Sequence, residues 1–212
     1  MFVMKKLNIL SISILALIFT ACSSVTRVAC VGDSITYGYG IPNDSAYPVV
    51  LSRNLGSKYS VLNFGESGKT LQKNSGFSYW SCKELTNVMA LRPNIIIIKL
   101  GTNDTKHAFW NADNYAKDYQ SLVDTFRTIP GNPRIYLCLP VPVFKTNFGI
   151  TEAVLTSGVL PIVEQTAKLN GLTLIDLYHP MKDQATNFPD GVHPNAKAAK
   201  KMADIITTAI KK

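Results

Sequence analysis

Short apolar runs alternate along the chain with segments whose apolar positions recur at helical spacing. The clearest run is IIIIKL at 95–100, because four consecutive isoleucines are typical of a strand that is buried on both faces. Similar runs predict strands at 27–31, 59–63, 134–139 and 172–176, and helices are predicted at 45–55, 78–91, 111–129, 152–169 and 195–210. This alternation predicts an α/β fold, in which right-handed crossovers join a parallel sheet that helices cover on both faces.

The N-terminal residues follow another pattern. Two lysines precede an apolar run at 7–21, which is too short and too near the N-terminus for a membrane span and is typical of an export signal. Its end, FTAC, resembles a bacterial lipobox in which Cys22 is lipidated, although a cut after Ser24 by an ordinary signal peptidase stays open. We therefore expect a signal peptide at 1–21, one domain at 26–212 that no linker divides, and export to the periplasm or cell surface with a lipid anchor at Cys22.

Charge and cysteine content narrow the possible partners. The formal net charge is +8, and many of the lysines gather in the last predicted helix without aromatic residues between them. That pattern favours a solvated helix face over a nucleic-acid site, and it also suits acidic glycans or an anionic membrane surface. Cys30, Cys82 and Cys138 fit small core positions, with one pair able to form a disulfide, and no Cys or His spacing indicates a metal site.

Candidate chemistry gathers where the first three predicted strands end. Gly32, Asp33 and Ser34 follow the first strand, Gly65 follows the second, and GTND at 101–104 follows the third. The carboxyl ends of parallel strands meet at one edge of a sheet, so these residues are expected to lie together. Alone, Ser34 would be interpreted as a helix cap, which means that a base and an oxyanion site elsewhere must support a catalytic role.

A serine hydroxyl becomes a nucleophile when a neighbouring base takes its proton and a third group orients that base. Asp190 and His193, in DGVHP, offer both partners, since a carboxylate three residues before an imidazole can reach one ring nitrogen and leave the other facing outward. A second such pair, Asp176 and His179, follows directly on a strand and lacks the glycine, so we place His179 on a surface turn. His107, which follows the GTND loop, is a candidate substrate contact.

Ester hydrolysis also needs hydrogen-bond donors for the oxyanion of the tetrahedral intermediate, and the loss of one such donor typically costs about 10²- to 10³-fold in rate. The side chain of Asn103 can give one N–H, and the backbone at Gly65 can approach closely and give another. Each feature alone would be interpreted as a turn residue. Together with Ser34 and His193 at one sheet edge, they indicate an acyl-transfer site.

Four segments carry a family resemblance: GDSIT with Ser34, NFGESG with Gly65, GTND with Asn103 and DGVHP with His193. They resemble the four blocks of the SGNH, or GDSL, hydrolase family, in the family's order and over almost the whole chain after the leader. The resemblance implies a flavodoxin-like three-layer α/β/α sandwich with strand order 2-1-3-4-5 and no metal or other cofactor. It also implies roles: Ser34 as nucleophile, His193 as base and then acid, Asp190 orienting His193, and the N–H groups of Ser34 and Gly65 with the Asn103 side chain as the oxyanion hole.

We therefore predict a serine esterase that hydrolyses small acyl esters, O-acetyl groups in particular, on carbohydrate through an acyl-enzyme. Loop aromatic residues suit stacking on sugar rings, with Trp80 the first choice and His107 a polar contact. A lysophospholipase or thioesterase is the nearer alternative, although no long apolar lid for fatty-acyl chains is evident. Two alternatives of other classes are a P-loop-like nucleotide site at GESGKT, which needs glycine where Asn63 stands, and a non-catalytic glycan-binding module. The sequence leaves the sugar and the oligomeric state open.

Overall fold

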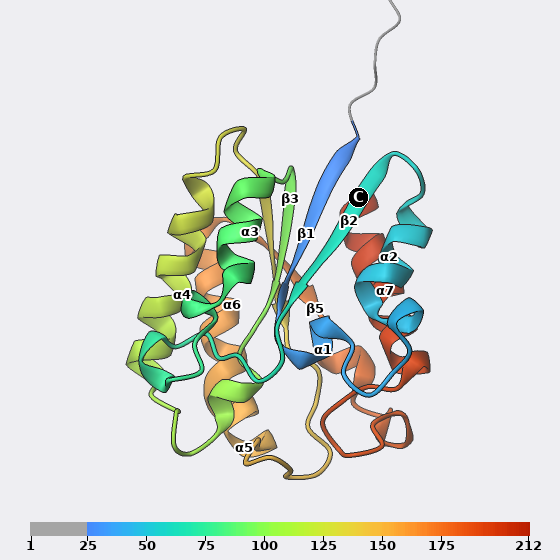
Figure 1. Ribbon diagram of the computed structural model, residues 1–212. Helices are drawn as coiled ribbons and strands as arrows, with labels where there is room; N and C mark the ends of the chain where they lie inside the picture. Colours follow the sequence, from blue (N-terminus) through green and yellow to red (C-terminus); the bar gives the residue numbers. More distant parts are fainter. Residues whose placement is uncertain (1–24) are drawn as a thin grey trace, which may run out of the picture.

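The structure, a computed structural model that describes residues 25–212, contains a five-stranded parallel sheet with helices on both faces (Figure 1). The strands are β1 (Thr26–Gly32), β2 (Tyr59–Gly65), β3 (Ile95–Lys99), β4 (Arg134–Leu139) and β5 (Thr173–Asp176). Their order across the sheet is β2-β1-β3-β4-β5, so the predicted three-layer α/β/α fold is confirmed. The expected signal peptide at 1–21 and the expected lipid anchor at Cys22 lie outside the described residues and stay predictions.

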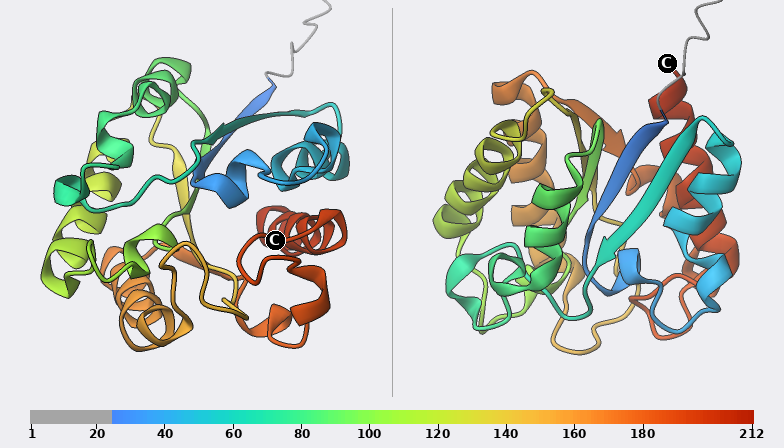
Figure 2. Two further views of the ribbon diagram at one scale, coloured as in Figure 1. Left: turned by 60° about the horizontal axis from the view of Figure 1, so that its bottom comes forward. Right: turned by 45° about the horizontal axis from the view of Figure 1, so that its top comes forward.

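Two groups of helices cover the two faces of the sheet (Figures 1 and 2). One face carries α2 (Tyr47–Leu55) and α7 (Ala196–Lys211), and the other carries α3 (Lys83–Leu91), α4 (Ala112–Arg127) and α6 (Leu160–Asn170). Side chains alternate between the faces, so Val28 and Cys30 of β1 enter the core beneath α2 and α7, while Ala29 and Val31 enter the other core. Every residue of β3 is buried because both of its faces are covered.

Two of the predicted helices are interrupted. The helix predicted at 78–91 opens with a separate 3₁₀ turn, Tyr79–Ser81, and α3 follows it. The helix predicted at 152–169 consists of α5 (Glu152–Val154), a π-helical turn (Leu155–Val159) and α6. Pro161, in the first turn of α6, has no N–H to donate to the preceding turn, which accounts for the wider turn at this point.

The three cysteines of the described residues are unbridged. Cys30 and Cys138 are buried in the core beneath α2 and α7, and Cys82 lies partly buried at the start of α3. The disulfide that the sequence left open is therefore absent from residues 25–212, while the assignment of the two strand cysteines to core positions is confirmed. Within the same residues, no helix is long and apolar enough to cross a membrane.

The carboxyl ends of the strands form one edge of the sheet, which faces the viewer in the left panel of Figure 2. Helix α1 (Ser34–Tyr37) follows β1 at this edge, and a loop follows β2. A short 3₁₀ turn, Asn103–Thr105, follows β3, and the long connection from β4 to α5 reaches the same edge. The residues that the sequence singled out for chemistry therefore arrive here from separate strands.

Candidate active site

Ser34 is the first residue of α1, a one-turn helix that begins directly after β1. The Asp33 carboxylate caps this helix by accepting the Ile35 N–H at 3.0 Å, and Ser34 is only 8% exposed. Gly32 allows the chain to turn so tightly, because a Cβ at this position would lie 2.0 Å from a hydroxyl oxygen of α1. These local contacts fix the serine at the carboxyl edge of the sheet.

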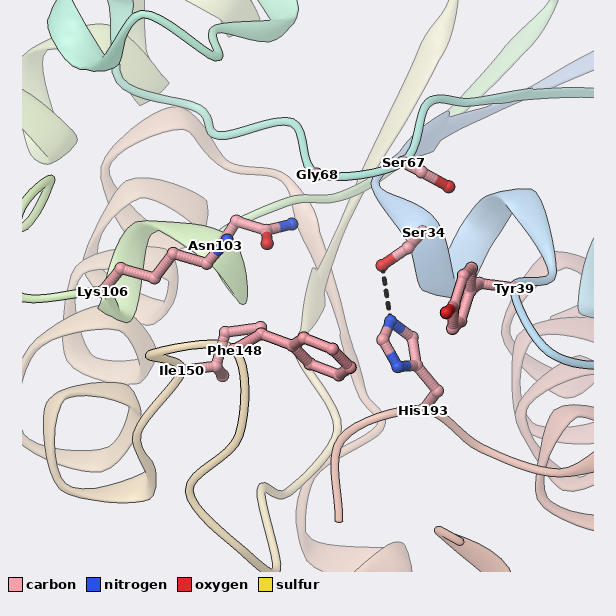
Figure 3. Close-up of a pocket in the computed structure, with 9 residues that line it drawn as sticks. All are labelled: Ser34, Tyr39, Ser67, Gly68, Asn103, Lys106, Phe148, Ile150 and His193. Carbon is pink, nitrogen blue, oxygen red and sulfur yellow. Dashed lines mark hydrogen bonds between the residues drawn. The ribbon is translucent and has the colours of Figure 1, made fainter. Parts of the chain in front are cut away.

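His193 lies against Ser34, and Asp190 lies against His193. The distance from His193 Nε2 to Ser34 Oγ is 2.9 Å (Figure 3), and the distance from His193 Nδ1 to Asp190 Oδ2 is 2.7 Å. With a carboxylate on Nδ1, that nitrogen carries the proton and Nε2 is left to accept from the serine hydroxyl. The structure therefore brings the three predicted residues together in the order that proton transfer from Ser34 needs.

Hydrogen bonds keep the Asp190 carboxylate charged. Partial burial raises the pKa of Asp190, but the backbone and ring N–H groups of His193 and the backbone N–H of Val192 outweigh burial and hold that pKa below its ordinary value. The stability that this ionised group contributes is present above the ordinary pKa of a carboxyl group and is lost as the pH falls through the lowered one. At any pH near neutral, Asp190 is therefore ionised and able to orient His193.

Asp176 and His179 form the same local arrangement. His179 Nδ1 lies 2.9 Å from Asp176 Oδ2, and Asp176 Oδ1 accepts the backbone N–H groups of Tyr178 and His179 at 2.9 and 3.0 Å. The His179 side chain, however, is 56% exposed and packs against Tyr178 instead of a serine. The predicted surface turn is confirmed, and the spacing of Asp and His alone does not distinguish the two pairs.

Gly191, in the turn that carries His193, allows a neighbouring loop to pack closely against this turn. Its φ is +84°, and a Cβ at this position would lie 2.5 Å from a side chain of the loop 140–151. The glycine lets that loop pack against the turn, where the Gly191 carbonyl oxygen accepts the Phe144 N–H at 2.8 Å. Through this contact the loop brings Phe148 to within 5.7 Å of the His193 ring, measured between centroids.

A cavity of about 200 Å³ opens beside Ser34 (Figure 3). Five separate segments of the chain form its walls, with Ser34, Tyr39, Ser67, Gly68, Asn103, Lys106, Phe148, Ile150 and His193 as the lining residues. The cavity is small compared with pockets for drug-sized ligands, which usually measure about 300–1,000 Å³. A reacting group in it would lie between the serine and the Asn103 amide.

The glycine at this cavity is Gly68 and not Gly65. The Gly65 N–H donates to the Asn63 side-chain oxygen at 2.9 Å, and a Cβ at Gly65 would lie 2.2 Å from the Tyr37 nitrogen, so Gly65 serves to pack β2 against α1. Gly68 has a φ of +79° and lines the cavity, and no acceptor within residues 25–212 takes its N–H. The prediction that the Gly65 N–H faces an oxyanion is therefore wrong.

Asn103 faces the cavity from the 3₁₀ turn after β3. One N–H of its side chain donates to the Lys69 carbonyl oxygen at 3.1 Å, which leaves the other N–H for a ligand. The neighbouring Asp104 carboxylate accepts the backbone N–H groups of Leu71 and Gln72 at 2.9 Å each, and so fastens the loop after β2 to this turn. Burial raises the pKa of Asp104 to about 6, although those N–H groups act in the opposite direction.

Comparison with known proteins identifies the family. The profile of the GDSL-like lipase/acylhydrolase family matches residues 30–201, which is most of the chain. The chain belongs to that family. Among its relatives, an acetylxylan esterase from Xylanibacter ruminicola is 37% identical over 206 residues, which cover 87% of this chain and 43% of that protein.

Two further comparisons place this GDSL-like chain among known proteins. The cellulase/esterase CelE from Acetivibrio thermocellus is 20% identical, over 87% of this chain and 25% of its own length. The chain therefore spans less than half the length of the curated relatives it matches. Est24, a carbohydrate acetylesterase from Sinorhizobium meliloti, has the same fold, with a TM-score of 0.73, 20% identity and coverage of 88% of this chain and 98% of that one.

Two half-exposed aromatic rings flank His193 in this GDSL-like site. Tyr39 is 48% exposed with its ring centroid 4.6 Å from that of His193, and Phe148 is 53% exposed and edge-on to the same imidazole. Phe148 adopts a left-handed φ of +53°, a conformation that costs a non-glycine residue roughly 1–2 kcal/mol. Backbone strain of this kind gathers at functional sites. Sequence reasoning did not single out Phe148, since no local pattern shows that its loop folds back onto His193.

The predicted sugar contacts Trp80 and His107 lie outside the cavity. Trp80 packs against the core on the α3 and α4 side, where its Nε1 donates to the Leu71 carbonyl oxygen at 3.0 Å and the Lys73 ammonium lies 4.2 Å from the ring centroid. His107 is exposed and is not among the lining residues. Because Trp80 is occupied in holding the loop after β2, its prediction as the first sugar contact is wrong. A substrate contact at His107 stays a prediction.

The P-loop alternative is contradicted by the structure of the GESGKT segment. A phosphate-binding loop of that kind continues directly into a helix, whose N-terminus holds the phosphate. Here Thr70 forms a β-bridge with Ser78 instead, and the next α-helix, α3, starts only at Lys83.

Among residues 25–212, no group of three or more His, Cys, Asp or Glu side chains could hold a metal ion.

Proposed function

We propose that this protein is a serine esterase that removes acetyl groups from carbohydrate. The observation that carries the proposal is the series of contacts from Asp190 through His193 to Ser34. Ser34 lines a small cavity whose wall also contains N–H donors. The substrate class is supported by an acetylxylan esterase at 37% identity and by a carbohydrate acetylesterase of the same fold.

Acylation begins when Ser34 Oγ attacks the carbonyl carbon of the ester. His193 Nε2 takes the hydroxyl proton across 2.9 Å, and the Asp190 carboxylate stabilises the imidazolium that forms. His193 then gives this proton to the sugar oxygen, so the C–O bond breaks and the sugar leaves as an alcohol. The acetyl group remains on Ser34, and water attacks it with His193 again as the base, which releases acetate and restores the hydroxyl.

The oxyanion that forms in each step needs preorganised donors. We assign this role to the backbone N–H groups of Ser34 and Gly68 and to the Asn103 side chain, all at the wall of the cavity. The N–H of Ser34 lies in the first turn of α1, where helical backbone N–H groups have no partner within the helix, and no acceptor among residues 25–212 takes it. Gly68 takes the place that the sequence had given to Gly65.

The first prediction concerns the length of the acyl group. A cavity of about 200 Å³ admits an acetyl group beside Ser34 but leaves little room for a chain, so kcat/KM should fall at least about tenfold from p-nitrophenyl acetate to the butyrate ester. Acetate release from acetylated xylans, pectins, chitooligosaccharides and sialic acids identifies the sugar in the same experiment. Rapid hydrolysis of octanoate esters without acetate release from any glycan would instead favour a lysophospholipase or thioesterase.

The second prediction concerns Tyr39 and Phe148. Because both rings are half-exposed beside His193, we expect them to stack on the sugar, so Tyr39→Ala and Phe148→Ala should each raise KM for an acetylated oligosaccharide about three- to tenfold. The KM for p-nitrophenyl acetate should change less. Phe77→Ala is the matched control, since Phe77 is 57% exposed and packs against Phe109 outside the cavity. Equal KM changes in the control would contradict a sugar contact at the two rings.

A further inference from the structure

Lys99 is a fully buried lysine at the end of β3, with 0% of its side chain exposed. Its three ammonium N–H groups meet three acceptors: Asp33 Oδ1 at 3.0 Å, Asp33 Oδ2 at 3.1 Å and the Thr102 hydroxyl at 2.9 Å. The Asp33 side chain is equally buried. None of the chemical steps above uses this buried and fully hydrogen-bonded ion pair, although Asp33 is the residue before Ser34.

Each partner of Lys99 precedes a residue of the proposed site. Asp33 comes directly before Ser34 and caps α1, so the ammonium holds the turn that carries the nucleophile. Thr102 comes directly before Asn103, so the same ammonium holds the turn that carries the oxyanion donor. One side chain thereby connects the turn after β1 with the turn after β3.

Stability alone gives no reason for this ion pair. The removal of two charges from water is costly, and apolar residues of similar volume often replace a buried ion pair with no loss of stability or even a gain. Burial lowers the pKa of Lys99, and the Asp33 carboxylate acts in the opposite direction. A strand that already buries four isoleucines would hold a fifth apolar residue without difficulty, so the pair calls for a functional explanation.

We propose that Lys99 is a positioning residue for the ester hydrolysis proposed above, on which this inference rests. Through Asp33 and Thr102 it fixes Ser34 relative to Asn103, so that the nucleophile and the oxyanion donor meet the same carbonyl group. Its charge also balances the buried Asp33 carboxylate, which would otherwise oppose the negative charge of the oxyanion. Both effects act in the transition state, so they concern kcat and leave KM nearly unchanged.

Three variants test the proposal: Lys99→Met, Thr102→Val and the double variant Asp33→Asn/Lys99→Met. We measure kcat and KM with p-nitrophenyl acetate, count active sites with a fluorophosphonate and record Tm. Lys99→Met should lower kcat about 10- to 100-fold with little change in KM, and Thr102→Val should lower it less. The double variant buries no charge, so it should regain the Tm lost in Lys99→Met but not the kcat.

Ile97→Val is the matched control, because Ile97 is fully buried on the same strand and faces the same core but lies outside the site. It should lower Tm without lowering kcat. A wild-type kcat in the double variant would overturn the proposal, since it would limit the pair to a stabilising role. If Lys99→Met does not fold, the kcat values of the double variant and of Thr102→Val test the proposal instead. Failure of the proposed function is a different result, in which the wild-type protein and Ser34→Ala hydrolyse the acetate equally.

Discussion

Ser34→Ala should remove nearly all esterase activity, with a fall of about 10⁴- to 10⁶-fold in kcat/KM for p-nitrophenyl acetate. The physical reason is that the Ser34 hydroxyl is the atom that becomes acetylated, and a methyl group can neither attack the carbonyl nor give a proton to His193. The backbone N–H at position 34 and the donors at Gly68 and Asn103 remain in the variant. We therefore expect substrate to bind still, and any residual rate to reflect these donors alone.

The Ser34→Ala variant must keep the wild-type fold for its loss of activity to be informative. Ser34 Oγ has His193 as its hydrogen-bond partner within residues 25–212 and lies at the wall of a cavity, so its loss should change Tm little. Intact-mass analysis after treatment with a fluorophosphonate should show one adduct on the wild-type protein and none on the variant. Unchanged acetate release by a folded Ser34→Ala variant would falsify the acetyl-serine mechanism.

The parts of the site that the sequence predicted are those that local structure determines. Ser34 follows a buried strand and a glycine, and Asp33 caps the helix it begins, so its place at the sheet edge depends on a few neighbouring residues. Asp190 and His193 form their pair within one turn, from hydrogen bonds between residues at most three positions apart. Parallel strands then bring these turns to one edge without further information.

The parts that the sequence missed depend on contacts between distant residues. NFGESG contains two glycines, Gly65 at the end of β2 and Gly68 in the loop after it. Only the Asn63 side chain, which accepts the Gly65 N–H, shows that Gly68 is the one at the cavity. Phe148 reaches His193 because its loop packs on Gly191, which lies 43 positions further along the chain, and no periodicity reports such a contact.

Lys99 was missed for another reason. The run IIIIKL was interpreted as apolar, although a lysine inside a strand buried on both faces is rare and requires a buried partner. That signal was present in the sequence, and Asp33 at the end of the neighbouring strand was an available carboxylate.

The second large effect is expected from a comparison of two histidines. His193→Ala should lower kcat about 10³-fold or more, because it removes the base for the Ser34 hydroxyl and the acid for the leaving sugar oxygen. His179→Ala should stay within about twofold of the wild-type kcat, because its side chain is 56% exposed on a surface turn. Steady-state hydrolysis of p-nitrophenyl acetate, with Tm for both variants, checks the pair.

This comparison is unusually well matched, because both histidines donate the same local hydrogen bonds, from the backbone N–H and from Nδ1, to an aspartate three residues earlier. The distances from Nδ1 to the carboxylate are 2.7 Å at His193 and 2.9 Å at His179, so the loss of the local pair is common to both variants. What differs is the partner of Nε2, which is Ser34 in one case. A large loss of kcat in His179→Ala with a small loss in His193→Ala would therefore show that His179 is the base and that its assignment to His193 is wrong. Equal small losses would show that both carboxylate–imidazole pairs serve the fold and not the chemistry.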